Sequence, residues 1–177
     1  MKITFNKRFE LLLREYDLPG DFSFQIEIPE YTQTILDGKI LVTEEGITLE
    51  PISKGLYKAK EKWENQSIIE DNLNHFHVDW DIEPPDNKKA FMLGIKTLIL
   101  LAIKFEKQAL DGIRFWYHFG TPELTKQWAI AHNLHRGDDE EYFISDRLSF
   151  YTRRAGEEII SINSEEDSFN AILIIDI

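Results

Sequence analysis

The stretch from residue 87 to residue 109 constrains the fold more than any other part of the chain. Nearly all of its charged side chains are lysines, and Lys89, Lys96 and Lys107 fall close to one line when successive residues advance by 100°. The remaining surface is a wide apolar arc that other elements must cover. Asp111-Gly112 then ends the pattern. We therefore predict a buried helix at about 87–109 that exposes one stripe of lysines to solvent. The rest of the chain would pack around this helix.

An alternating segment lies on each side of this helix. In residues 75–82 and again in residues 113–119, every second side chain is apolar. The polar positions between them hold His75, His77, Asp79, Asp81, Arg114, Trp116 and His118. A period of two predicts strands, and strand, helix and strand together would form a βαβ unit with parallel strands. The polar side chains of both strands would then share one face of a sheet.

The rest of the chain predicts antiparallel meanders at both ends. We expect helices at 7–16 and 121–133, a candidate helix at 57–65, and strands at 22–28, 34–36, 39–42, 47–51, 143–153, 158–162 and 169–177. Asp37-Gly38 is typical of a two-residue hairpin turn between two of these strands. The sequence therefore predicts a single α+β domain over residues 1–177. Its sheet is largely antiparallel, with N- and C-terminal meanders and a central βαβ unit.

Composition excludes several classes of protein. The chain has no cysteine, which excludes disulfide scaffolds, thiolate zinc sites and a cysteine nucleophile. The apolar run at the N-terminus is too short for a signal peptide, and residues 90–103 are too short for a membrane span. A net charge of −12 disfavours nucleic-acid binding, which needs a positive field. We therefore expect a cytoplasmic protein that binds neither membranes nor nucleic acids.

His75, His77 and Asp79 have the spacing of a metal site, because side chains two residues apart on a strand project to the same side. The five residues from His75 to Asp79 resemble part of the His-x-His-x-Asp-His motif of metallo-β-lactamase-fold hydrolases. Trp80 stands where that family has its next histidine. The resemblance implies a metal-dependent hydrolase with a divalent metal such as zinc as cofactor. Further candidate ligands downstream are His118, His132, His135 and Asp146.

Trp116 favours a different function. A tryptophan on a polar sheet face needs a cover, which residues 120–141, a protein partner or a second copy of the chain could supply. Tryptophan and arginine dominate the binding energy of many interfaces, and an acidic chain attracts basic partners. We therefore expect a non-enzymatic binding protein without a cofactor, of the inhibitor or immunity type, that sequesters a basic protein. Its expected contact residues are Asp79, Asp81, Arg114, Trp116, His118, Asp138, Asp139 and Glu140.

Three alternatives stay open beside this hypothesis. The first is the metal-dependent hydrolase that uses His75, His77 and Asp79. The second is a homo-oligomer that buries Trp116 against its own copy. The third is a polar sheet face that is only solvated, since polar cross-strand pairs add a few tenths of a kcal/mol by themselves.

Overall fold

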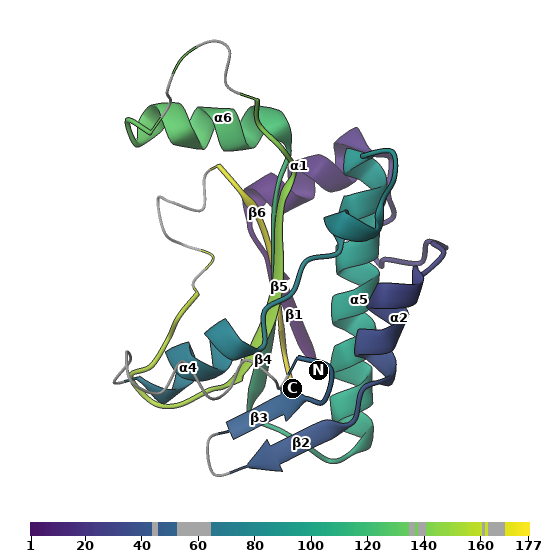
Figure 1. Cartoon of the computed structure of the whole chain (residues 1–177), viewed down its shortest axis with the longest axis vertical. Coiled ribbons are helices and arrows are strands. Elements are labelled where there is room, and N and C mark those ends of the chain that lie inside the picture. Colours follow the sequence, from purple (N-terminus) through teal and green to yellow (C-terminus); the bar gives the residue numbers. More distant parts are fainter. Residues whose placement is uncertain (44–45, 53–64, 135–136, 138–140, 161, 163–168) are drawn as a thin grey trace.

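A four-stranded antiparallel sheet forms the centre of the computed structural model (Figure 1). Its order is β1-β6-β4-β5, and every neighbouring pair is antiparallel. The strands are β1 (Lys2–Phe5), β4 (Ile113–Gly120), β5 (Ser145–Thr152) and β6 (Ala171–Asp176). A separate hairpin pairs β2 (Ile40–Thr43) with β3 (Gly46–Leu49). The structure describes residues 1–43, 46–52, 65–134, 137, 141–160, 162 and 169–177.

Helices lie on both sides of the sheet (Figure 1). On one side are α1 (Lys7–Glu15), α2 (Glu30–Asp37) and α5 (Asn87–Lys107), and on the other are α4 (Gln66–Leu73) and α6 (Pro122–Ala131). Four of these helices begin at a side-chain cap that accepts a hydrogen bond from a backbone N–H of the first turn. The capping residues are Asn6, Asn65, Asp86 and Thr121.

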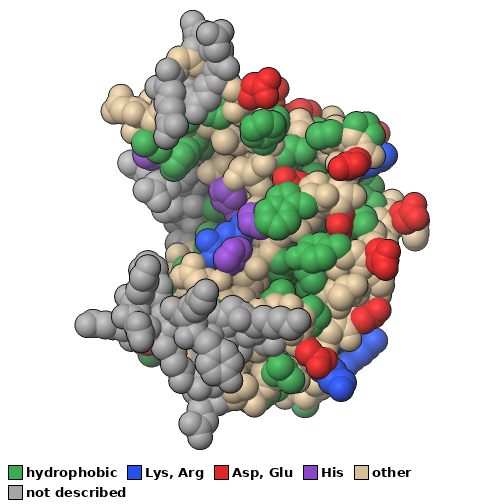
Figure 2. All heavy atoms as spheres, viewed as in Figure 1, with side chains coloured by type: hydrophobic (Ala, Val, Ile, Leu, Met, Phe, Trp, Pro, Cys, Tyr) green, Lys and Arg blue, Asp and Glu red, His purple; other side chains and the backbone are tan. Residues whose placement is uncertain are grey.

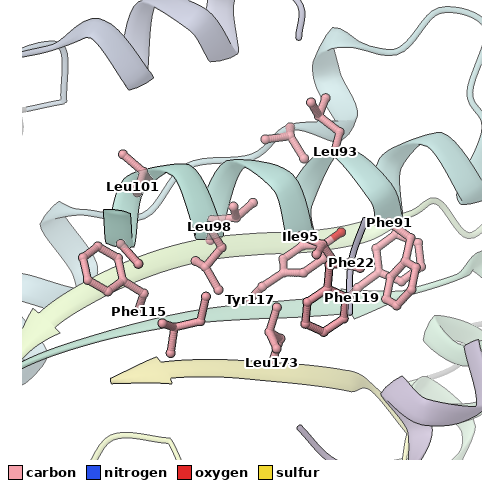
Figure 3. Close-up of a cluster of buried hydrophobic side chains, with 14 of the residues drawn as sticks. Phe22, Phe91, Leu93, Ile95, Leu98, Leu101, Phe115, Tyr117, Phe119 and Leu173 are labelled. Atoms are coloured by element: carbon pink, nitrogen blue, oxygen red, sulfur yellow. The ribbon is translucent and has the colours of Figure 1, made fainter. Parts of the chain in front are cut away.

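Helix α5 packs along the sheet and supplies the largest share of the core. Phe91, Ile95 and Leu98 face β4 and β6, whereas Leu93 points away from the sheet (Figure 3). All four side chains are almost fully buried. The helix is therefore covered on more than one side, which agrees with its nearly continuous apolar surface.

The structure confirms part of the expected architecture. The α+β class, the largely antiparallel sheet and the buried helix near 87–109 are confirmed. Helices at 7–16 and 121–133 and strands at 143–153 and 169–177 are also present, with ends that differ by a few residues. The candidate helix at 57–65 lies, apart from Asn65, outside the described residues.

The predicted βαβ unit is wrong. Both neighbours of β4 are antiparallel to it, and residues 75–82 form no strand. The expected N-terminal meander is present only in part. The strands predicted at 39–42 and 47–51 pair antiparallel as β2 and β3, but residues 22–28 lack strand pairing and residues 34–36 belong to α2. The expected C-terminal meander is wrong as well, because residues 158–160 and 162 are not in a strand and β4 lies between β5 and β6. In these segments the side chains alternate or a turn signal is present, but no neighbouring strand among the described residues forms the backbone hydrogen bonds that a β-sheet requires.

Candidate functional site

The segment between α4 and α5 carries the candidate site. Phe76 makes a single bridge to Leu148 of β5, and the chain then enters a short 3₁₀ turn, η2 (Asp79–Asp81). Asp146 causes this departure from the sheet, because its Oδ2 accepts hydrogen bonds from the backbone N–H groups of Val78 (3.0 Å) and Asp79 (3.2 Å). The turn ends the predicted alternation. Val78 is fully buried, whereas Trp80, two residues later, is 70% exposed.

His77, Asp79 and Asp146 meet at this turn. His77 Nδ1 lies 3.1 Å from Asp146 Oδ1, and one ligand-type atom from each of the three residues lies within 4.8 Å of the other two. Asp146 is 2% exposed, while His77 and Asp79 are half-buried. Asp79 Oδ1 is shielded from solvent and has no hydrogen-bond partner among the described residues. We call these three residues the His77 cluster.

Electrostatics within the His77 cluster favour one positive charge near two carboxyl groups. Burial raises the pKa of Asp79 to about 7, and the hydrogen bond to Asp146 and the negative charge of that residue act in the same direction. The hydrogen bond to Asp146 raises the pKa of His77. A second negative charge is therefore costly beside Asp146 unless a cation or a proton accompanies it.

Two exposed aromatic rings lie beside the cluster. The Trp80 ring stacks on His77 with ring centroids 4.8 Å apart and planes inclined by 22°. Phe143 is 70% exposed, as Trp80 is, and both line an open hollow of about 330 Å³ together with the His77 cluster and Glu141. Figure 2 shows large hydrophobic side chains beside histidines near the centre of the visible face. We call the surface formed by Trp80, Phe143 and Glu141 the Trp80 patch.

The structure separates the residues that the sequence placed on one polar face. Asp79 lies in the His77 cluster, but Asp81 lies at the N-terminal turn of α2, where its Oδ2 accepts hydrogen bonds from Thr32 N and Oγ1 at 3.0 and 2.6 Å. His75 is exposed, and its Nδ1 lies 2.6 Å from Asn72 O, so it is not part of the cluster. The third candidate metal ligand beside His77 and Asp79 is therefore Asp146, and not His75 as the sequence predicted.

The remaining expected contact residues lie elsewhere in the fold or outside the described residues. Arg114 donates two hydrogen bonds to Asp176, at 2.8 and 3.0 Å, and one to Glu158 at 2.8 Å. His118 lines a second hollow, of about 400 Å³, with Trp128 and Ile172. Asp138, Asp139 and Glu140 lie outside the described residues.

Trp116 is covered by other parts of its own chain, and its described contacts come from α4, β5 and the isoleucines at 159, 160 and 162. Its indole Nε1 donates a 2.6 Å hydrogen bond to Asp71 Oδ1 of α4, and the Arg147 guanidinium lies 5.1 Å from the ring centroid. Ile159, Ile160 and Ile162 pack against the small hydrophobic cluster that Trp116 forms with Tyr151, Ile172 and Ile174. Because Trp116 is only 6% exposed, it offers no surface to a partner or to a second copy.

Helix α4 was absent from the prediction, although it supplies this cover. Asn65-Gln66-Ser67 reads as a loop from composition, yet Asn65 is the N-cap and its side chain accepts a hydrogen bond from Ile68 N. The buried face of α4 is mostly polar: Ser67, Glu70 and Asp71 all contact β5 or the chain beyond it. A polar buried face has no hydrophobic periodicity, so only the cap could have indicated this helix.

Comparison of the chain with known protein families, with curated proteins and with solved structures finds no match. Within the part of the chain that the structure describes, no helix combines the length and the apolar character needed to cross a membrane.

Proposed function

We propose that this protein is an acidic binding protein that captures a basic protein through the Trp80 patch. The supporting observation is the pair of rings, Trp80 and Phe143, which are each 70% exposed beside Glu141 and the His77 cluster. Large exposed apolar side chains with a polar rim are typical of interaction sites. Tryptophan is also the most favourable ring for a lysine or arginine cation placed over its face.

The charge of the whole chain supports a basic partner. The net charge is −12, with 32 acidic and 20 basic residues, so a cationic protein is attracted over distances comparable to the Debye length. An enzyme that acts on a polyanion, such as a nuclease, carries a positive active-site surface. An acidic protein seated on that surface would compete with the substrate, which is the inhibitor or immunity type of function.

The test is affinity capture from the native host with wild-type protein and with the double variant Trp80→Ala/Phe143→Ala. We expect a basic protein that is held at low salt, released at high salt, and reduced at least tenfold by the double variant. The control is Val42→Ala, because Val42 is similarly exposed (67%) but lies on β2, away from the patch. Capture of no basic protein, or equal capture by wild type and double variant, would overturn the proposal.

Inhibition is tested separately with the captured protein. If the partner is a nuclease, adding this chain should suppress cleavage of its substrate, and the double variant should suppress it much less. A partner whose enzymatic activity is unchanged at saturating concentrations of the chain would exclude the inhibitor function and leave binding alone.

A further inference from the structure

We infer that His77, Asp79 and Asp146 bind a divalent transition-metal ion, with zinc as the best-suited probe. The inference is independent of the proposed partner binding. It differs from the sequence-based expectation in its ligands, because Asp146 replaces His75.

The donor set fits such an ion. One imidazole nitrogen and two carboxylate groups are ligands of Zn²⁺, Mn²⁺ and Fe²⁺, whereas Mg²⁺ prefers oxygen ligands alone. In a tetrahedral zinc site with bonds of about 2.0–2.1 Å, neighbouring ligand atoms lie about 3.3 Å apart. His77 Nδ1 and Asp146 Oδ1 are separated by 3.1 Å. The third donor is within 4.8 Å, a distance that rotation of a carboxylate can close.

An atom without a partner points to a missing cation. Asp79 Oδ1 is shielded from solvent and accepts no hydrogen bond from any described residue, and the Asp79 carboxyl group as a whole lies beside that of Asp146, with which it can share a hydrogen bond only when one of the two is protonated. Leaving a buried acceptor unsatisfied is unfavourable, and more so if it is charged. A metal ion between the carboxylates would remove this cost and neutralise both groups.

The ligands are held in place before any ion binds. Two backbone N–H groups fix the Asp146 carboxylate, and the Trp80 ring stacks on the His77 imidazole. All three residues of the His77 cluster line the hollow, and Thr125 lines it too. Thr125 Oγ1 is a second shielded polar atom without a hydrogen-bond partner among the described residues, so it could bond to a metal-bound water.

The test is calorimetric titration of zinc chloride into protein purified without an affinity tag and stripped with a chelator. We expect one zinc ion per chain. His77→Gln and Asp79→Asn should each weaken zinc binding by at least about tenfold, since each removes a ligand. His75→Gln is the matched control, because this exposed histidine lies two residues away and outside the cluster, and it should change affinity less than about twofold. Magnesium chloride should give no binding.

A stability measurement provides a second readout. Zinc should raise the melting temperature of wild type and His75→Gln but not of Asp79→Asn. Without zinc, Asp79→Asn should melt no lower than wild type, because it removes a carboxylate from beside Asp146. No zinc binding to wild type, or equal weakening by His75→Gln and His77→Gln, would overturn the inference.

Discussion

Asp71 satisfies donors from three different side chains beneath α4. Its carboxylate accepts hydrogen bonds from Trp116 Nε1 and Arg147 Nη2, both at 2.6 Å, and its backbone carbonyl accepts one from Ser149 Oγ at 2.7 Å. The side chain of Asp71 is 5% exposed. The two hydrogen bonds to the buried carboxylate and the one to the backbone carbonyl together fix how α4 sits on the sheet.

Replacing Asp71 with alanine should lower the free energy of unfolding by about 2–3 kcal/mol. The change leaves the indole N–H of buried Trp116 without its acceptor and removes the ion-pair partner of Arg147, whose partial exposure (31%) reduces the cost. Urea unfolding followed by circular dichroism measures the change. Asp111→Ala, at an exposed position, is the control and should stay within about 0.5 kcal/mol of wild type. Equal losses in the two variants would contradict the role given to Asp71.

Sequence reasoning found two of the three residues of the His77 cluster. The spacing of His77 and Asp79 singled them out, and Asp146 was one of several downstream candidates. Which candidate joins them depends on a contact between residues 69 positions apart, and local patterns carry no information about such a contact. His75 and Asp79 are each two residues from His77. The His75 ring, however, contacts the backbone carbonyl of Asn72 near the end of α4, a helix that the sequence did not predict.

At the scale of elements, alternation in residues 22–28 predicted burial correctly but not strand pairing. Phe22 and Phe24 are buried, and Ser23 and Gln25 are exposed, as a strand at 22–28 requires. The segment nevertheless packs against the core without a paired strand among the described residues. A period of two reports that one side of an extended chain is covered, and it does not report what covers it.

The Asp37-Gly38 signal was wrong for a related reason. Gly38 has φ −53°, so it is not the left-handed residue of a hairpin turn, and it ends α2 instead. A Cβ at Gly38 would lie 2.3 Å from Pro51 Cδ. Close approach of another segment therefore requires this glycine, and a local turn rule cannot detect an approach from thirteen residues away.

Gly94 sets the distance between α5 and the sheet. A Cβ at this position would lie 2.1 Å from Tyr117 Cζ. The Tyr117 ring is fully buried, and its hydroxyl donates a 3.1 Å hydrogen bond to Ala90 O, so it cannot move aside easily. The helix and β4 can be in contact only because residue 94 has no side chain.

Gly94→Ala should therefore destabilise the protein although alanine is the better helix former. The gain in helix propensity is about 1 kcal/mol, whereas overpacking a buried site costs about 1–3 kcal/mol, and a contact this short belongs at the upper end. We expect a net loss of about 2 kcal/mol in thermal or urea unfolding. Gly20→Ala is the control, since nothing lies within 4 Å of a Cβ at Gly20, and it should be nearly neutral. A stabilised Gly94→Ala variant would show that α5 and β4 separate freely.

At the scale of the whole molecule, the sequence predicted the fold class but not the order of the strands. Antiparallel pairing of β4 with both β5 and β6 brings Trp116 opposite Ser149 and Ile174. This pairing, with α4 across it, turns the expected polar face into a buried interface within the chain. The candidate binding surface is consequently not the predicted sheet face but the hollow lined by Trp80 and Phe143, which are exposed.

The net charge of −12 should make stability depend on salt. Raising sodium chloride from about 0.01 M to 0.15 M shortens the Debye length from about 30 Å to about 8 Å and screens repulsion between exposed acidic groups. Shielded pairs such as Arg147 with Asp71 are screened less. A gain of about 1 kcal/mol would raise the melting temperature by about 2–4 °C for a chain of this length.

A charge-reduced variant separates this repulsion from other effects of salt. Substituting Asp138→Asn, Asp139→Asn, Glu140→Gln and Glu141→Gln changes the net charge from −12 to about −8, since four acidic residues are removed from the 32 in the chain. Because repulsion grows with the product of like charges, the variant should melt higher than wild type at low salt and gain less from added salt. Differential scanning calorimetry of both proteins at the two salt concentrations measures this difference. Equal salt increments in the two proteins would show that charges elsewhere determine the salt dependence.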